Sequence, residues 1–252
     1  MKKLALAVSI LTASVVNASA ADLAARPYTK APPPIVAPLY VWSGFYIGLN
    51  GGGGWSHKCW DLNTQAGVFQ ANMGCHDATG GLAGGQVGYR WQAGSWVFGL
   101  EAQGDWANLT GSNPNPLNPA ATNQSKITAL GLFTGQVGYA WNNVLWYVKG
   151  GVAVVNDKYT GIGAIVGPFD QASETRWGGA VGTGLEFGFA PNWSVAVEYD
   201  HAFLGSRSLN LLSTGAVIPP GAFSRNVTVR QDLDMITARV SYRFGGPVIA
   251  KY

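Results

Sequence analysis

After residue 43, apolar and polar residues alternate along eight separate stretches of the chain. The clearest stretch is 96–106, in which residues of one parity, here the even-numbered positions, are apolar and those of the other parity are polar. The apolar set is Trp96, Phe98, Leu100 and Ala102, and the polar set is Glu101, Gln103 and Asp105. Similar alternation runs through 44–55, 194–200 and 236–244. Because successive side chains of a strand point to opposite faces, this period of two predicts β-strands with one apolar and one polar face.

The links between these stretches are short and long in strict alternation. The short ones are Gln92–Ser95, Asn142–Asn143 and Ala190–Asn192, and the long ones lie at about 56–78, 107–125, 156–173 and 203–226. Short turns at one end and long loops at the other are typical of transmembrane barrels. The sequence therefore predicts an all-β fold, a transmembrane antiparallel eight-stranded up-and-down β-barrel, over residues 44–252.

The charged residues of the strands are expected to point into the lumen. A charge facing the lipid midplane costs about 2–4 kcal/mol for Arg or Lys, so the apolar parity must face the bilayer. The inward parity then holds five acids, Glu101, Asp105, Glu186, Glu198 and Asp200, and five bases, Arg90, Lys126, Lys149, Arg239 and Arg243. Equal numbers of the two signs predict a lumen closed by paired charges, because eight strands leave an interior that side chains fill.

Aromatic residues gather at the predicted strand ends. At the short-turn end lie Trp91, Trp96, Trp141, Trp146, Trp193, Tyr242 and Phe244, and at the other end lie Trp55, Trp106 and Trp177. Aromatic girdles at both membrane interfaces are a property of outer-membrane barrels. Gly85–Trp91 and Gly135–Trp141 repeat the pattern Gly-Gln-Val-Gly-Tyr-x-Trp, whose inward glycine leaves room for a bulky neighbour in the lumen.

The first residues have the pattern of a secretory signal peptide, with a basic start, an apolar segment and Ala18-Ser19-Ala20. We expect 1–20 to be this signal, and 21–43, which is rich in proline, to be a periplasmic linker. It is either a plain spacer or a peptidoglycan contact. Loss of two lysines with the signal lowers the formal net charge from +3 to +1. A net charge this small does not indicate nucleic-acid binding. No apolar run after the signal is long enough for a transmembrane helix.

Three groups of segments carry a family resemblance: Trp42–Gly52, the two Gly-Gln-x-Gly-Tyr-x-Trp strands, and the tail Tyr242–Tyr252. With them the chain resembles the alphaproteobacterial outer-membrane surface-antigen proteins, porin-like members of the OmpA-like eight-stranded barrel group. The resemblance implies an abundant surface protein of the Gram-negative outer membrane with extracellular loops and periplasmic termini. It also implies membrane lipid and lipopolysaccharide as surroundings, and the barrel assembly machinery as a partner during biogenesis. Some relatives are haem binders or adhesins, which leaves a host surface as a further candidate partner.

Cys59 and Cys75 are the only cysteines, and both lie in the first predicted loop. A disulfide is expected, because a secreted chain enters an oxidising compartment. His57 and His76 flank the pair, so a metal or haem site with two nitrogen and two sulfur ligands is the alternative. We expect the disulfide and no cofactor. The cysteine pair is a departure from the family pattern.

The function predicted is structural, with a role in envelope integrity and surface interactions. Asp200-His201, followed by Ser206 and Ser208, defines no catalytic triad, so we expect no enzyme activity. Two alternatives remain open at this point. One is a small-solute porin, and the other is ligand or host binding through loops, in which the apolar residues of 203–226 form a contact patch: Phe203, Leu204, Leu209, Leu211, Leu212, Val217, Ile218 and Phe223.

Overall fold

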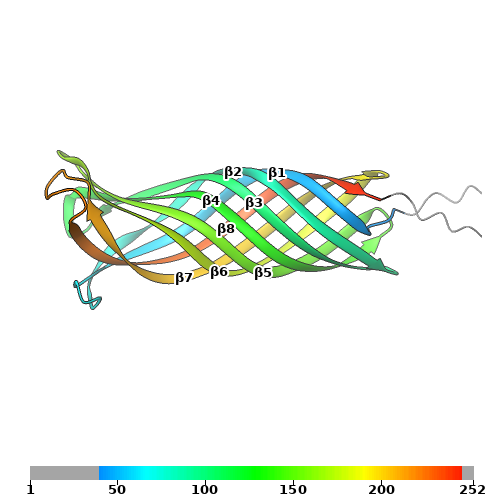
Figure 1. Ribbon diagram of the computed structural model, residues 1–252, viewed down its shortest axis with the longest axis horizontal. Helices are drawn as coiled ribbons and strands as arrows, with labels where there is room; N and C mark the ends of the chain where they lie inside the picture. The colour runs from blue at the N-terminus through cyan, green and yellow to red at the C-terminus, as the bar shows by residue number, and fades with distance from the viewer. Residues whose placement is uncertain (1–39, 246–252) are drawn as a thin grey trace, which may run out of the picture. The chain divides into compact units, whose positions relative to one another are not determined.

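The computed structural model describes residues 40–245 and has eight antiparallel strands that close into a barrel (Figure 1). The strands are β1 (Gly44–Asn63), β2 (Phe69–Ala93), β3 (Trp96–Asn115), β4 (Asn118–Trp141), β5 (Val144–Gly163), β6 (Gly167–Ala190), β7 (Trp193–Ser213) and β8 (Phe223–Phe244). Each strand pairs with the next, and β1 closes the ring with β8. The predicted fold is confirmed. The expected signal peptide and the linker up to residue 39 lie outside the described residues.

No helix in the described part of the chain is long and apolar enough to cross a membrane.

The predicted long loops at 56–78, 107–125, 156–173 and 203–226 are wrong. Each of these segments is instead the continuation of two paired strands around a short tip, at 64–68, 116–117, 164–166 and 214–222. The strands are 20 to 25 residues long, whereas about 9–11 residues of a tilted strand cross a bilayer. The barrel therefore continues well beyond the membrane at the end opposite the short turns.

The outward face changes from apolar to polar at the ring formed by Trp55, Trp106 and Trp177. We call the part of the barrel between this ring and the aromatic residues of the short-turn end the membrane band. Its outward side chains are apolar and exposed, as at Leu49, which is 75% exposed. On β3 the interval from Trp96 to Trp106 matches the length of a membrane crossing. All seven aromatic residues predicted for the short-turn end also point outward. Short turns are periplasmic in such barrels, so the Trp55, Trp106 and Trp177 ring marks the outer boundary of the bilayer.

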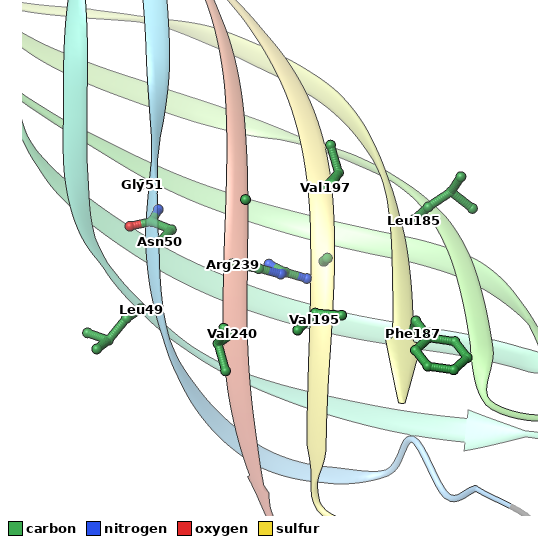
Figure 2. A pocket seen from close by; sticks show the side chains of 11 residues that line it. Leu49, Asn50, Gly51, Leu185, Phe187, Val195, Val197, Arg239 and Val240 are labelled. Atoms are coloured by element: carbon green, nitrogen blue, oxygen red, sulfur yellow. The ribbon is translucent and has the colours of Figure 1, made fainter. Parts of the chain in front are cut away.

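Figure 2 shows the lipid-facing side of β1, β8, β7 and β6 from close by. A hollow of about 580 Å³ lies here, lined by apolar side chains such as Leu49, Leu185 and Val240. Arg239, the neighbour of Val240, is buried on the opposite face. This alternation within one strand separates an apolar surface for acyl chains from a charged interior.

Two inward glycines make room for tyrosine rings in the lumen. A Cβ atom on Gly88 would overlap the Tyr46 ring, and one on Gly184 would overlap the Tyr147 ring. The space for a bulky neighbour that the repeated Gly-Gln-Val-Gly-Tyr pattern predicts is therefore present at Gly88. The two tyrosines can reach into the barrel only because the strands beside them carry no side chain at these positions.

Candidate functional site

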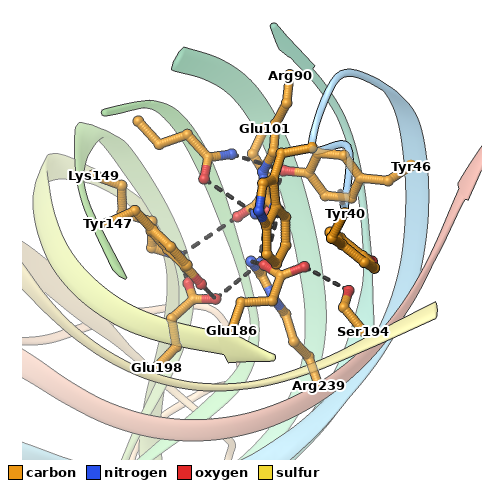
Figure 3. A network of polar contacts seen from close by, with 12 residues as sticks. Tyr40, Tyr46, Arg90, Glu101, Tyr147, Lys149, Glu186, Ser194, Glu198 and Arg239 are labelled. Atoms are coloured by element: carbon orange, nitrogen blue, oxygen red, sulfur yellow. Dashed lines mark hydrogen bonds and ion pairs between the residues drawn. The ribbon is translucent and has the colours of Figure 1, made fainter. Parts of the chain in front are cut away.

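The candidate site is the charged layer inside the membrane-spanning part of the barrel (Figure 3). Arg239 reaches from β8 toward three carboxylates on other strands. Its Nη1 atom lies 2.8 Å from Glu101 Oε2 and 2.8 Å from Glu198 Oε2. Its Nη2 atom donates to Glu186 Oε2 at 2.8 Å. A guanidinium with its donors in a fixed fork is suited to join several carboxylates at once.

Arg90 is the second cation of this layer. Its Nη1 atom lies 2.8 Å from Glu186 Oε2, so Glu186 is shared by both arginines. The guanidinium also lies over the Tyr46 ring, 4.5 Å from its centroid. The Tyr46 hydroxyl donates to Glu101 at 2.6 Å, and the Tyr147 hydroxyl donates to Glu198 at 2.8 Å. Each tyrosine hydroxyl thus donates to a carboxylate oxygen that Arg239 also contacts.

Lys149 completes the layer. Its Nζ atom contacts Glu198, lies 3.2 Å from Asp200 Oδ1 and lies 3.6 Å from Glu101 Oε1. Asp105 accepts a hydrogen bond of 2.8 Å from Gln103 and has no ion pair among residues 40–245. The structure therefore brings together seven of the residues that the sequence assigns to the lumen network: Arg90, Glu101, Lys149, Glu186, Glu198, Asp200 and Arg239.

Two predicted lumen bases lie elsewhere. Arg243 is buried near the short-turn end, where it donates to the carbonyls of Ser43 and Pro191 at 3.2 Å and 2.8 Å. Lys126 is exposed on the outer surface, so its assignment to the lumen is wrong. The reason is a β-bulge, because the register of β4 shifts between Ile127 and Ala129. One extra residue exchanges the inward and outward parities of the strand beyond that point.

Apolar layers lie on both sides of the charged layer. The outer one crosses the lumen with side chains that are 0 to 5% exposed: Leu82, Leu109, Ile127, Leu130, Leu132, Ala153, Val155, Ala180, Ala202, Leu204, Leu233 and Met235. The inner one, at the short-turn end, is formed by Trp42, Val97, Ala140, Leu145 and Tyr147. Tyr40 packs against it, so residues at the end of the expected linker help to close the base of the barrel. The charged layer is thus enclosed by apolar side chains.

A second polar layer, which the alternation of the strands did not predict, lies in the extracellular extension. Lys58 Nζ donates to Asp157 Oδ1 at 2.6 Å, and both side chains are fully buried. Burial lowers the pKa of Lys58, and Asp157 opposes that shift. His76 lies 2.8 Å from Asn113 Oδ1 and 2.7 Å from Ser125 Oγ, and burial lowers its pKa as well. The signal in the sequence was the parity of Lys58, which continues the inward set of β1.

The expected disulfide joins Cys59 of β1 to Cys75 of β2 on the outer face of the extension. His57 lies beside it, with Nε2 at 3.4 Å from Cys59 Sγ and Nδ1 at 2.7 Å from Asp77. His76 points into the lumen instead, because it is the next residue after Cys75 on a strand. The set of two nitrogen and two sulfur ligands is therefore not assembled, and the alternative of a metal site with these four ligands is wrong.

The residues considered for catalysis do not form a site either. Asp200 is buried in the lumen, whereas His201 lies on the outer face, with Nδ1 at 2.7 Å from Asp234 Oδ1. Ser208 shares a hydrogen bond with Thr228 on the outer face of β8. Neighbouring residues of one strand point to opposite sides, so Asp200 and His201 cannot act as a pair.

Comparison with known proteins identifies relatives along most of the chain. The outer membrane protein beta-barrel domain family matches residues 5–244. The 31 kDa outer-membrane immunogenic protein of Brucella melitensis is 29% identical over 226 residues, which cover 83% of this chain and 90% of that protein. The 25 kDa outer-membrane immunogenic protein of Brucella abortus is 27% identical over 241 residues, covering 93% and 96%. The 22 kDa outer membrane protein of Rhizobium leguminosarum is 28% identical over 193 residues, covering 75% and 74%. The chain therefore belongs to the outer membrane protein beta-barrel domain family and is a β-barrel protein of the bacterial outer membrane.

Proposed function

We propose that this protein is a closed structural barrel that supports the integrity of the outer membrane and presents its extracellular extension for surface contacts. The observation that supports it best is the apolar layer across the lumen, which includes Leu132, Leu233 and Met235. It lies between the charged layer of Arg239 and the polar layer of Lys58. A hydrated ion on its way through the lumen would have to shed its water in this layer.

That step is costly. Moving an ion without partners into an apolar environment has a large free-energy penalty, and the side chains of this layer are closely packed, with no exposure at Leu109, Ile127 and Leu233. The charged layer adds a second obstacle, because its ions already bind one another at about hydrogen-bond distance. A porin function would require both layers to open together.

Planar-bilayer recording of the purified, folded protein tests the closed lumen. We expect no reproducible single-channel openings from the wild-type barrel. The matched variant carries Leu132→Ser and Leu233→Ser, which make the apolar layer polar and smaller and leave the charged layer intact. We expect brief openings in this variant. Stable openings of uniform size in the wild-type protein would instead support the porin alternative.

A deletion strain tests the envelope role separately. Loss of the protein is expected to increase leakage of a periplasmic marker enzyme and sensitivity to detergent. Wild-type protein expressed from a plasmid should restore both properties. An unchanged envelope in the deletion strain, with the protein abundant in the parent, would contradict the structural role whatever the recordings show.

A second candidate function is surface binding at the extracellular tips. The tips hold exposed apolar side chains on all four hairpins: Val68, Leu117, Ile165, Val166, Val217 and Ile218. A hollow of about 460 Å³ lies among Ala120, Ile165, Phe169 and Ile218. The patch is smaller than the sequence indicates, because Leu204 and Leu211 are buried in the lumen. Replacement of 214–222 by a Gly-Ser segment, scored by binding to host cells, haem and lipopolysaccharide, tests this function.

A further inference from the structure

The outward face of β3, β4, β5 and β6 has an unusual composition directly above the Trp106 and Trp177 boundary. Its first three outward positions on each strand hold ten hydroxyl or amide side chains and two lysines: Asn108, Thr110, Ser112, Thr128, Lys126, Gln124, Asn156, Lys158, Thr160, Thr175, Ser173 and Gln171. We call these twelve residues the polar belt. It contains no carboxylate, although acids occur at the same height elsewhere on the barrel.

The row nearest the membrane is already ordered by hydrogen bonds. Thr128 Oγ1 donates to Asn156 Oδ1 at 3.0 Å, and Asn156 Nδ2 donates to Thr175 Oγ1 at 3.4 Å. These three side chains connect β4, β5 and β6 across the outer surface. The row lies next to Trp106, which pairs with Ala129 in the β3–β4 register, and so stands where the bilayer meets water.

The two lysines of the polar belt are direct neighbours. Lys126 and Lys158 are register partners in the β4–β5 ladder, and both are exposed on the same face. Like charges directly opposite one another destabilise a sheet. Neither lysine forms an ion pair with any residue in the described part of the chain. An anion from outside the chain that lies between the two ammonium groups would remove this repulsion.

The opposite side of the barrel differs in charge. There the outward positions of β8, β1 and β2 hold Asp232, His57 and Asp77 in one row, and Asp234 in the row below. His57 and His201 each lie 2.7 Å from one of these acids. The β4–β5 side therefore presents two lysines and no carboxylate, whereas on the other side the exposed cations Arg207 and Arg230 are accompanied by acids.

We propose that the polar belt binds the phosphorylated sugar head group of an outer-leaflet glycolipid. Lys126 and Lys158 would contact phosphate, and the hydroxyl and amide groups would bind the sugar. The acyl chains would lie below the boundary against Phe133 and Val152, which are exposed on the same strands. The position of the polar belt favours a membrane lipid over a soluble anion as the ligand, because the belt begins in the row directly above the aromatic ring. The inference goes beyond the proposed function and stands whether or not the lumen conducts.

The test measures binding of bisphosphorylated lipid A to the full folded barrel in detergent by native mass spectrometry. The variant carries Lys126→Gln and Lys158→Gln. The matched control carries Arg207→Gln and Arg230→Gln, which removes two exposed cations from β7 and β8. A basic residue near an anionic membrane surface contributes enough to change binding about fivefold. We therefore expect the lysine variant to bind about thirtyfold more weakly than wild type and the control within about twofold.

Two further arms identify the ligand chemistry. Lipid A without phosphates should bind the wild-type barrel as weakly as the bisphosphorylated form binds the lysine variant, and inorganic phosphate at equal concentration should not displace the lipid. Lys126→Arg with Lys158→Arg should retain binding. Equal loss in both glutamine variants, undiminished binding of the phosphate-free lipid, or displacement by inorganic phosphate would each overturn the proposal. Heat-modifiable migration on a gel verifies that every variant is folded.

Discussion

Replacement of Arg239 by methionine removes the centre of the charged layer and is the sharpest test of how the lumen is held. The substitution keeps much of the side-chain volume and leaves Glu101, Glu186 and Glu198 without their common partner. Removing one member of a buried ion pair costs about 3–5 kcal/mol, because the other charge stays in a poor environment.

The free-energy costs of losing the three ion pairs of Arg239 do not add. Arg90 remains beside Glu186, and Lys149 remains beside Glu198 and Glu101. We therefore expect the free energy of unfolding to fall by about 3–5 kcal/mol in total, and not by three times that amount. At acid pH, where carboxylates are neutral, the difference from wild type should become smaller.

The assay is equilibrium unfolding in urea with the barrel in lipid vesicles, followed by tryptophan fluorescence and by the gel shift on boiling. Arg243→Met is the matched control. Within residues 40–245 that arginine donates to two backbone carbonyls and to no carboxylate, so its loss should cost about 1–2 kcal/mol. Adding Glu101→Gln should restore part of the stability of the Arg239→Met barrel. A loss below about 1 kcal/mol for Arg239→Met, or further destabilisation by Glu101→Gln, would refute the reasoning.

Three further predictions concern other parts of the barrel. Burial lowers the pKa of His76, so its protonation favours the unfolded extension, and the stability of the extension is expected to fall as pH drops below about 6.5. Hydrogen exchange of the extension at pH 5 and 7.5 measures this loss. His76→Gln should remove the difference between the two pH values. Serine at Cys59 and Cys75 should cost the extension up to about 3 kcal/mol and speed proteolysis near the first tip, with an unchanged cleavage rate as the contrary result. Gly88→Val would overlap Tyr46 and should block folding into vesicles, as scored by the gel shift.

Much of this fold could be predicted from the period of two alone. In the membrane band, lipid requires apolar outward residues, so parity identifies the lumen residues Glu101, Glu198 and Arg239 without any three-dimensional information. Beyond the aromatic ring the strands were predicted as loops, because water replaces lipid around the barrel there. Outward residues become polar there, while inward residues are mixed, with apolar Trp60 and Leu211 beside charged Lys58. The alternation of apolar and polar residues is therefore lost, and the second half of each strand resembles a loop.

Two local features could not be predicted from the pattern. The β-bulge near Ile127 reverses the parity of Lys126, and bulges carry no reliable signal in a strand without glycine at that position. The base of the barrel is closed by Trp42, whose Nε1 atom donates to the Asn142 carbonyl at 3.0 Å. A residue that follows a proline-rich segment gives no hint of such a contact, because it depends on where the ends of the other strands meet.

The length of the strands has a consequence for any molecule that would bind this surface from outside. From Trp55 to Asn63, β1 continues as paired sheet, which at about 3.3 Å per residue and a tilt near 40° raises the tip about 20 Å above the bilayer. An antibody against this region would therefore contact a stem of paired strands, with side chains from neighbouring strands side by side. Antibodies raised against free peptides copied from 56–78 would bind the native surface poorly, whereas antibodies raised against the refolded barrel would bind it well.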